Sequence, residues 1–113
     1  MGSLNRTEEI TLDISSDDEN TPAFYVGDAK RGSYVTPGTL NGGPTIGIEV
    51  SYDKTTWLPL RVAAGTAVAA ITPAADPSAL PFPESVFSHR YARFVFSVAQ
   101  TSDRELKVFL AGD

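Results

Sequence analysis

The feature that most constrains the fold is the alternating stretch of residues 45–62, TIGIEVSYDKTTWLPLRV. Apolar side chains recur there at every second position, at Ile46, Ile48, Val50 and Tyr52. A period of two is typical of a strand with one buried face. The turn that follows begins at Asp53, whose carboxylate can accept hydrogen bonds from the backbone two residues on. The stretch therefore predicts a β-hairpin.

The return strand of this hairpin starts at Trp57 and contains Pro59. Proline has no backbone N–H and cannot donate to a sheet ladder. We therefore expect this strand to lie at the edge of its sheet or to carry a bulge.

Further short segments show the same strand pattern, at residues 9–14, 23–26, 33–40, 67–71, 91–98 and 105–111. Turn-forming residues separate them at intervals of roughly ten residues, which is typical of sandwiches and barrels. We predict an all-β fold, an antiparallel β-sandwich or a jelly-roll-like barrel of seven or eight short strands. Because residues 91–98 and 105–111 are close in sequence, we expect them to pair as a hairpin. The core is predicted to contain Ile46, Ile48, Val50, Phe94, Phe96, Leu106, Val108 and Leu110.

A proline-rich segment, residues 72–87, interrupts the strand pattern. One helical turn can form at Asp76–Leu80, with Pro77 at its first helical position. Long irregular segments in compact domains are often functional or interfacial. We therefore take Phe82 and Phe87 as candidate partner contacts.

The charge of the chain is concentrated at its beginning. The 113 residues carry a net charge of −5, and residues 1–20 hold six acids and one base. Residues 21–113 are neutral, with no basic stripe, which argues against nucleic acid as a partner. We predict an acidic N-terminal arm, residues 1–20, and a β-sandwich domain, residues 21–113. The arm is either a solvated tail or a docking segment for a basic surface, with Asp17, Asp18 and Glu19 as its candidate contacts. Residues 10–14 could add as a strand to a sheet edge of the same subunit or a neighbour.

The residues give little support for catalysis or for a bound metal. Cysteine is absent, and His89 is the one histidine, with no nucleophile motif beside it. A zinc site needs about three protein ligands, and the acids of residues 15–21 lack the spacing of a calcium-binding loop. We therefore expect no enzymatic activity, no cofactor and no metal.

The chain also lacks features of a membrane protein or an exported precursor. No apolar run approaches the roughly 18 residues of a membrane span. The first ten residues, MGSLNRTEEI, contain no hydrophobic signal region. We expect no membrane partner and no export by that route.

Four aromatic residues could serve either of two purposes: Tyr25, Tyr34, Tyr52 and Trp57. They could form a platform for a sugar, or they could fill the core or a subunit interface. The sequence favours the core or the interface, because large rings with one polar group are mostly used in that way.

The order of these features resembles a known class of proteins. A glycine-rich turn leads to IGIEVSYDKTTWLPL, a proline-rich excursion follows, and YARFVFSVAQTSDRELKVFLAG closes the chain. This order is similar to that of small virion structural proteins of tailed bacteriophages, over about residues 23–112. Lys54 departs from the pattern, because the class often has glycine there.

The resemblance implies a non-enzymatic structural role in the virion, with no catalytic residues to carry over. Most directly it implies a capsid decoration or cement protein that binds the major capsid protein or another virion protein, as a homo-oligomer. A small tail- or fibre-associated module is an alternative. A carbohydrate-binding or adhesion β-sandwich is the other hypothesis that the residues leave open.

Overall fold

The structure is a computed structural model that describes residues 7–112, apart from 28, 39, 41, 43, 61–69 and 72–75. The described residues form nine strands and one 3₁₀ helix, η2, at Glu84–Ser88. The strands are β1 (Thr7–Ile14), β2 (Phe24–Tyr25), β3 (Arg31–Val35), β4 (Ile46–Ser51), β5 (Leu58–Pro59), β6 (Ala70–Ile71), β7 (Ala79–Pro81), β8 (Tyr91–Phe96) and β9 (Arg104–Ala111).

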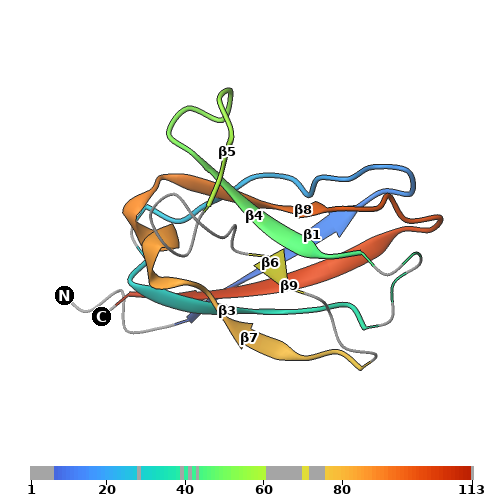
Figure 1. The fold of residues 1–113 in the computed structure, drawn as a ribbon. Helices are drawn as coiled ribbons and strands as arrows, with labels where there is room; N and C mark the ends of the chain where they lie inside the picture. The colour runs from blue at the N-terminus through green and yellow to red at the C-terminus, as the bar shows by residue number, and fades with distance from the viewer. Residues whose placement is uncertain are drawn as a thin grey trace.

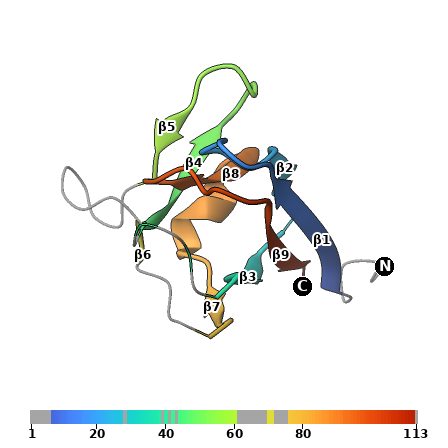
Figure 2. The same cartoon turned by 90° about the vertical axis from the view of Figure 1, so that its right-hand side faces the viewer.

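The strands form two antiparallel sheets that face each other (Figure 1, Figure 2). One sheet has the order β1-β9-β3-β7, and the other has the order β2-β8-β4-β5, with β6 also pairing with β4. The predicted all-β sandwich is therefore confirmed. The strand count exceeds the prediction by one because β7 forms in the proline-rich segment, where no strand was expected.

The core lies between the two sheets, where the inward side chains of every long strand meet. All eight predicted core residues are buried. An aromatic cluster fills the centre, with Phe94 within 5.9 Å of Phe24, 4.9 Å of Tyr34 and 5.9 Å of Phe82 between ring centroids. The buried Val86 of η2 closes one end of this core.

The β4–β5 hairpin forms as predicted, and β5 lies at the edge of its sheet. The burial pattern stops at the end of β4, however. Tyr52 continues the apolar phase of the strand, but 64% of its surface is exposed because the chain has left the sandwich at that point. Val98, beyond the end of β8, is 39% exposed for the same reason.

The expected hairpin between β8 and β9 is wrong. β8 pairs with β4 and β2, whereas β9 pairs with β1 and β3 in the other sheet. The intervening residues cross between the sheets and are held by hydrogen bonds to the segment after β1. The Asp17 N–H donates to the Gln100 carbonyl at 2.8 Å, and the Ser16 N–H donates to Asp103 Oδ1 at 2.9 Å.

The first strand belongs to the sandwich. β1 pairs with β9 along its whole length, from Thr7 opposite Ala111 to Ile14 opposite Arg104. Leu12 and Ile14 are buried in the common core. The expected edge addition of residues 10–14 is thus found within the same subunit, and the boundary drawn at residue 20 cuts through the folded sandwich.

The proline-rich segment takes a different conformation from the one expected. The helical turn predicted at Asp76–Leu80 is wrong, because β7 occupies residues 79–81 and pairs with β3. Leu80 precedes Pro81, and a residue before proline is biased towards extended backbone. The Ser78 N–H also donates to Thr36 Oγ1 at 3.1 Å, which secures the approach to β7. Part of the predicted strand at residues 67–71 lies outside the described residues, and β6 accounts for its end.

Candidate interaction surface

The turn of the β4–β5 hairpin is stiffened by its own side chains. The buried Ser51 hydroxyl donates to Asp53 Oδ1 at 3.0 Å and accepts from the Asp53 and Lys54 N–H groups at 3.1 and 2.9 Å. Asp53 Oδ1 in turn accepts from the N–H groups of Thr55 and Thr56, at 2.8 and 2.9 Å. The sequence prediction that Asp53 organises this turn is confirmed.

These bonds also set the ionisation of the turn. The Thr56 and Thr55 N–H groups, with the Ser51 hydroxyl, hold the pKa of Asp53 below its ordinary value of 3.8 because they favour the charged carboxylate. Lys54 adopts a left-handed backbone, with φ of 65°. That conformation favours glycine, so Lys54 occupies the position where the virion class often has glycine and bears a small backbone cost.

Cations and aromatic rings alternate on the outer face of the sheet below this turn. Lys54 Nζ lies 5.2 Å from the centroid of the Tyr91 ring, and the Arg93 guanidinium lies 4.3 Å from that of Trp57. Tyr25 packs edge-on against Tyr91 at 5.6 Å and is 49% exposed. The guanidinium of Arg93 also pairs with the carboxylate of Glu49. These contacts tie the hairpin to β8 and keep its direction fixed.

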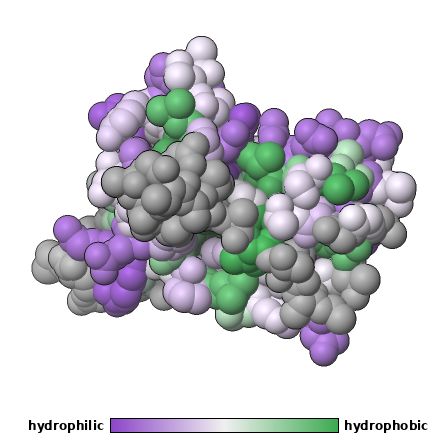
Figure 3. All heavy atoms as spheres, viewed as in Figure 1, coloured by the Kyte–Doolittle hydropathy of each residue, from purple (hydrophilic) through white to green (hydrophobic). Residues whose placement is uncertain are grey.

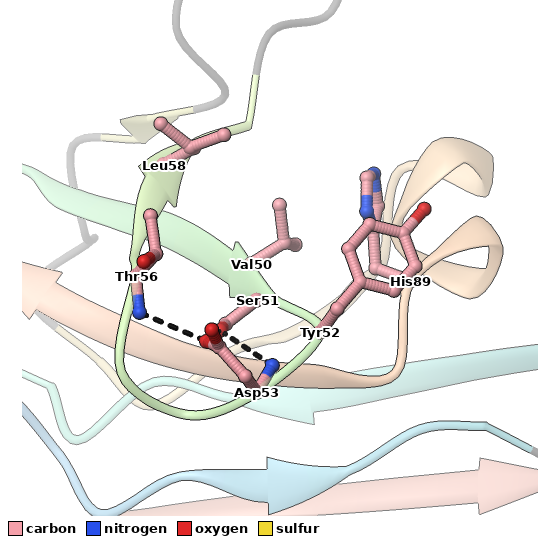
Figure 4. Close-up of a pocket in the computed structure, with 7 residues that line it drawn as sticks. All are labelled: Val50, Ser51, Tyr52, Asp53, Thr56, Leu58 and His89. Atoms are coloured by element: carbon pink, nitrogen blue, oxygen red, sulfur yellow. Dashed lines mark hydrogen bonds between the residues drawn. The ribbon is translucent and has the colours of Figure 1, made fainter.

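The other side of the hairpin carries two exposed apolar side chains. Tyr52 is 64% exposed and Leu58 is 61% exposed. Between them lies a hollow of about 140 Å³, whose lining is mainly apolar (Figure 4). Its lining residues are Val50, Ser51, Tyr52, Asp53, Thr56, Leu58 and His89. In the space-filling view, hydrophobic atoms reach the surface on the projecting hairpin and across the middle of that face (Figure 3). We call Tyr52, Leu58 and this hollow the hairpin surface.

His89 forms one wall of the hairpin surface. It follows η2, and its ring packs against Tyr52 with centroids 5.4 Å apart. Its buried Nδ1 has no hydrogen-bond partner among the described residues. The part of the chain that the structure describes brings no group of three or more His, Cys, Asp or Glu residues into a metal-binding arrangement. It also contains no helix long and apolar enough to cross a membrane.

The five partner contacts predicted from the sequence do not converge. Asp17, Asp18 and Glu19 are exposed in the loop after β1, at the end of the sandwich opposite η2 (Figure 1). Phe82 is only 7% exposed and belongs to the central aromatic cluster, and Phe87 packs edge-on against it at 6.0 Å. The structure therefore leaves the three acids free to meet a partner, whereas a partner could reach little of Phe82.

The four aromatic residues considered as a sugar platform are also dispersed. Tyr34 is buried in the core, Tyr25 and Trp57 lie on the outer face of the five-stranded sheet, and Tyr52 is at the hairpin surface. Sequence reasoning placed Tyr52 on a buried face and did not single out Leu58. The signal that could have found both is their position next to the turn. Apolar residues that flank a hairpin turn can continue the period of two of the strand and still lie beyond the core.

These features define a small antiparallel β-sandwich with a stiff projecting hairpin. No family model matches the chain, and no curated protein matches it in sequence. Among solved structures, the chain is similar to the SPBc2 prophage-derived protein YomS, with a TM-score of 0.62 and 12% identity over 95% of this chain and 96% of that one. At this identity the similarity shows a shared fold. A chain from the disulfide-linked pili of Bacillus endospore appendages gives a TM-score of 0.45 and 13% identity, over 96% of this chain and 88% of that one.

Proposed function

We propose that this chain is a non-enzymatic structural protein of a bacteriophage virion that attaches to the particle through its hairpin surface. In its most specific form the proposal is a capsid decoration protein that contacts the major capsid protein. The observation that carries it is the pair of exposed apolar side chains, Tyr52 and Leu58, on a hairpin fixed by side-chain hydrogen bonds.

Physical reasoning supports a binding role for this hairpin. Exposed tyrosine and leucine beside an apolar hollow lose contact with water when a partner covers them, and that burial favours association. A rigid presentation lowers the entropy lost on binding. The prophage origin of YomS, which shares the fold, and the order of sequence motifs point in the same direction.

The test is co-sedimentation with phage particles assembled without the protein. We expect the double variant Tyr52→Ser/Leu58→Ser to lose attachment, because both apolar contacts are removed. The matched control is Val98→Ser, which removes another exposed apolar side chain, beyond the end of β8 that lies away from Tyr52. Attachment of the double variant at wild-type strength would contradict the proposal, provided that all three proteins melt alike.

A second candidate function is glycan binding, favoured by the rings on the outer face of the five-stranded sheet. Tyr25 and Tyr91 lie there, and further along β4 and β8 the sheet has a hollow of about 350 Å³ lined in part by Glu49 and Val95. Sugar rings stack on exposed aromatic rings, and sugar hydroxyls donate hydrogen bonds to carboxylates. A glycan array probed with wild type and with Tyr25→Ser distinguishes the two candidates. Glycan binding that is lost in Tyr25→Ser would support the second candidate, and a decoration protein should show no such signal.

A further inference from the structure

The edges of the two sheets differ in how they are protected. β5 is two residues long and contains Pro59, β7 is three residues long and contains Pro81, and β2 is two residues long and follows Pro22. Short strands and prolines are the usual means of blocking unwanted strand addition. β1 has neither, since it is eight residues long and contains no proline. Figure 2 shows β1 at the outer margin of its sheet, with no described element beyond it.

The hydrogen bonds of the sheet reveal which backbone groups of β1 face outward. The Phe82 N–H donates to the Gly32 carbonyl, and the Thr36 N–H donates to the Ser78 carbonyl, so even-numbered residues of β3 bond towards β7. Odd-numbered residues of β3 must then bond towards β9, because bonding direction alternates along an antiparallel strand.

The same alternation carries across to β1. Val35 lies opposite Lys107, so odd-numbered residues of β9 bond to β3 and even-numbered ones bond to β1. Ile10 lies opposite Val108 and Leu12 opposite Leu106, so these two residues of β1 bond to β9. The N–H and C=O groups of Glu9, Thr11 and Asp13 therefore point out of the sheet at its open edge.

The edge strand itself carries acids and no base, although Lys107 of β9 pairs with Glu9 at 3.3 Å. Glu9, Thr11 and Asp13 lie on the solvent face of β1, because the alternate residues Leu12 and Ile14 are buried. Asp13 stands directly opposite Glu105, and both are exposed. Like charges in opposite positions of a sheet repel each other, so a basic residue beside Asp13 would relieve that repulsion.

We propose that the open edge of β1 binds an extended segment of a partner protein that carries basic residues at alternate positions. The segment would add to the four-stranded sheet as a fifth strand, with main-chain hydrogen bonds to Glu9, Thr11 and Asp13 and with its basic side chains near the two acids. Asp17, Asp18 and Glu19, which follow in the next loop, extend the acidic surface beyond the strand.

A second copy of this chain fits the edge less well. Antiparallel pairing of two β1 strands about Thr11 places Glu9 of each copy opposite Asp13 of the other. Two such like-charged pairs oppose association. Charge complementarity therefore selects a basic partner segment over self-pairing.

This inference names a partner for the proposed virion protein, but it uses a different surface from the hairpin. The probe is a ten-residue synthetic peptide that alternates lysine with valine, and an otherwise identical peptide with glutamate in place of lysine is its control. Binding of fluorescent peptide to the full chain is measured by anisotropy. Amide hydrogen exchange is followed with and without peptide.

The critical variant is Thr11→Pro, which removes an outward N–H and leaves the bonds of Ile10 and Leu12 to β9 in place. Its matched control is Thr11→Val, which keeps the N–H. We expect Thr11→Pro to weaken binding of the lysine peptide about tenfold or more, because the hydrogen bond from the Thr11 N–H is lost. Thr11→Val should bind like wild type. Because proline could disturb the strand, Glu9→Gln/Asp13→Asn serves as a second variant that should weaken binding and leave the backbone unchanged.

Exchange supplies an independent readout. In the free protein the Glu9, Thr11 and Asp13 amides should exchange faster than those of Ile10 and Leu12, and the lysine peptide should slow them. The proposal is overturned if the glutamate peptide binds as tightly as the lysine peptide, if Thr11→Pro binds like Thr11→Val, or if the free chain dimerises through β1. Lysine-peptide binding by a chain that does not attach to particles would leave this inference standing and would refute the proposed function alone.

Discussion

Removal of the Phe94 ring is the sharpest test of the packing. Phe94 is fully buried, and its ring meets those of Phe24, Tyr34 and Phe82. Its backbone N–H donates to Thr21 Oγ1 at 3.0 Å, a bond that Phe94→Ala leaves in place, so the variant isolates the side chain. Truncation of a buried phenylalanine to alanine costs about 3–5 kcal/mol of unfolding free energy. Small domains are stable by only about 5–15 kcal/mol, so the loss should be a large share of the total.

The assay is thermal unfolding followed by circular dichroism. For a chain of this size each kcal/mol lowers Tm by roughly 3–6 °C, so a loss of about 3–5 kcal/mol predicts a fall of about 10–30 °C. Phe94→Leu should fall between wild type and Phe94→Ala, because it retains part of the buried volume. Val98→Ala, at an exposed apolar site, is the control and should change stability by less than about 0.5 kcal/mol. A Tm for Phe94→Ala within about 2 °C of wild type would refute the packing described for β8.

Three further outcomes are expected. The pKa of Asp53 is lowered in the folded state, so its ionised carboxylate stabilises the fold above pH 3.8 and this effect is lost as the pH falls further. The difference in unfolding free energy between wild type and Asp53→Asn, measured by urea unfolding, should therefore shrink below that pH. Burial raises the pKa of Tyr34 above 10.0, so the unfolded chain ionises first and wild type should lose stability above pH 10; Tyr34→Phe should abolish that part of the alkaline loss. Deletion of residues 1–20 removes the buried Leu12 and Ile14 and a whole strand, so the truncated chain should give no cooperative melt; a sharp melt would restore the idea of a detachable arm.

The sequence was sufficient for the strands whose alternation is long. Ile46, Ile48 and Val50 in β4, like Leu106 and Val108 in β9, follow a period of two, and that period identifies the buried face directly. Asp53 was equally readable, because the turn chemistry of aspartate is local.

Strand pairing and the limits of the core could not be predicted from the periodicity of the sequence. A period of two says which face is buried but not which strand lies alongside. Closeness in sequence predicts that β8 and β9 pair, whereas they belong to opposite sheets. Tyr52 kept the right phase and still became exposed, because the phase carries no information on where the sandwich ends. Phe82 lies in a proline-rich segment without a period, and three-dimensional packing alone places it among the central rings.

The pairing of β1 with β9 governs when the fold can form. Thr7 and Ala111 are opposite each other, so the first strand has no partner until the last one has been synthesised. During translation Leu12 and Ile14 stay exposed to water until β9 has left the ribosome. Contacts so distant in sequence close slowly, because the loop entropy is lost before the pairing energy is gained. The four-stranded sheet is therefore expected to close in one late step, after β9 has been synthesised, and until then its apolar residues are exposed to aggregation.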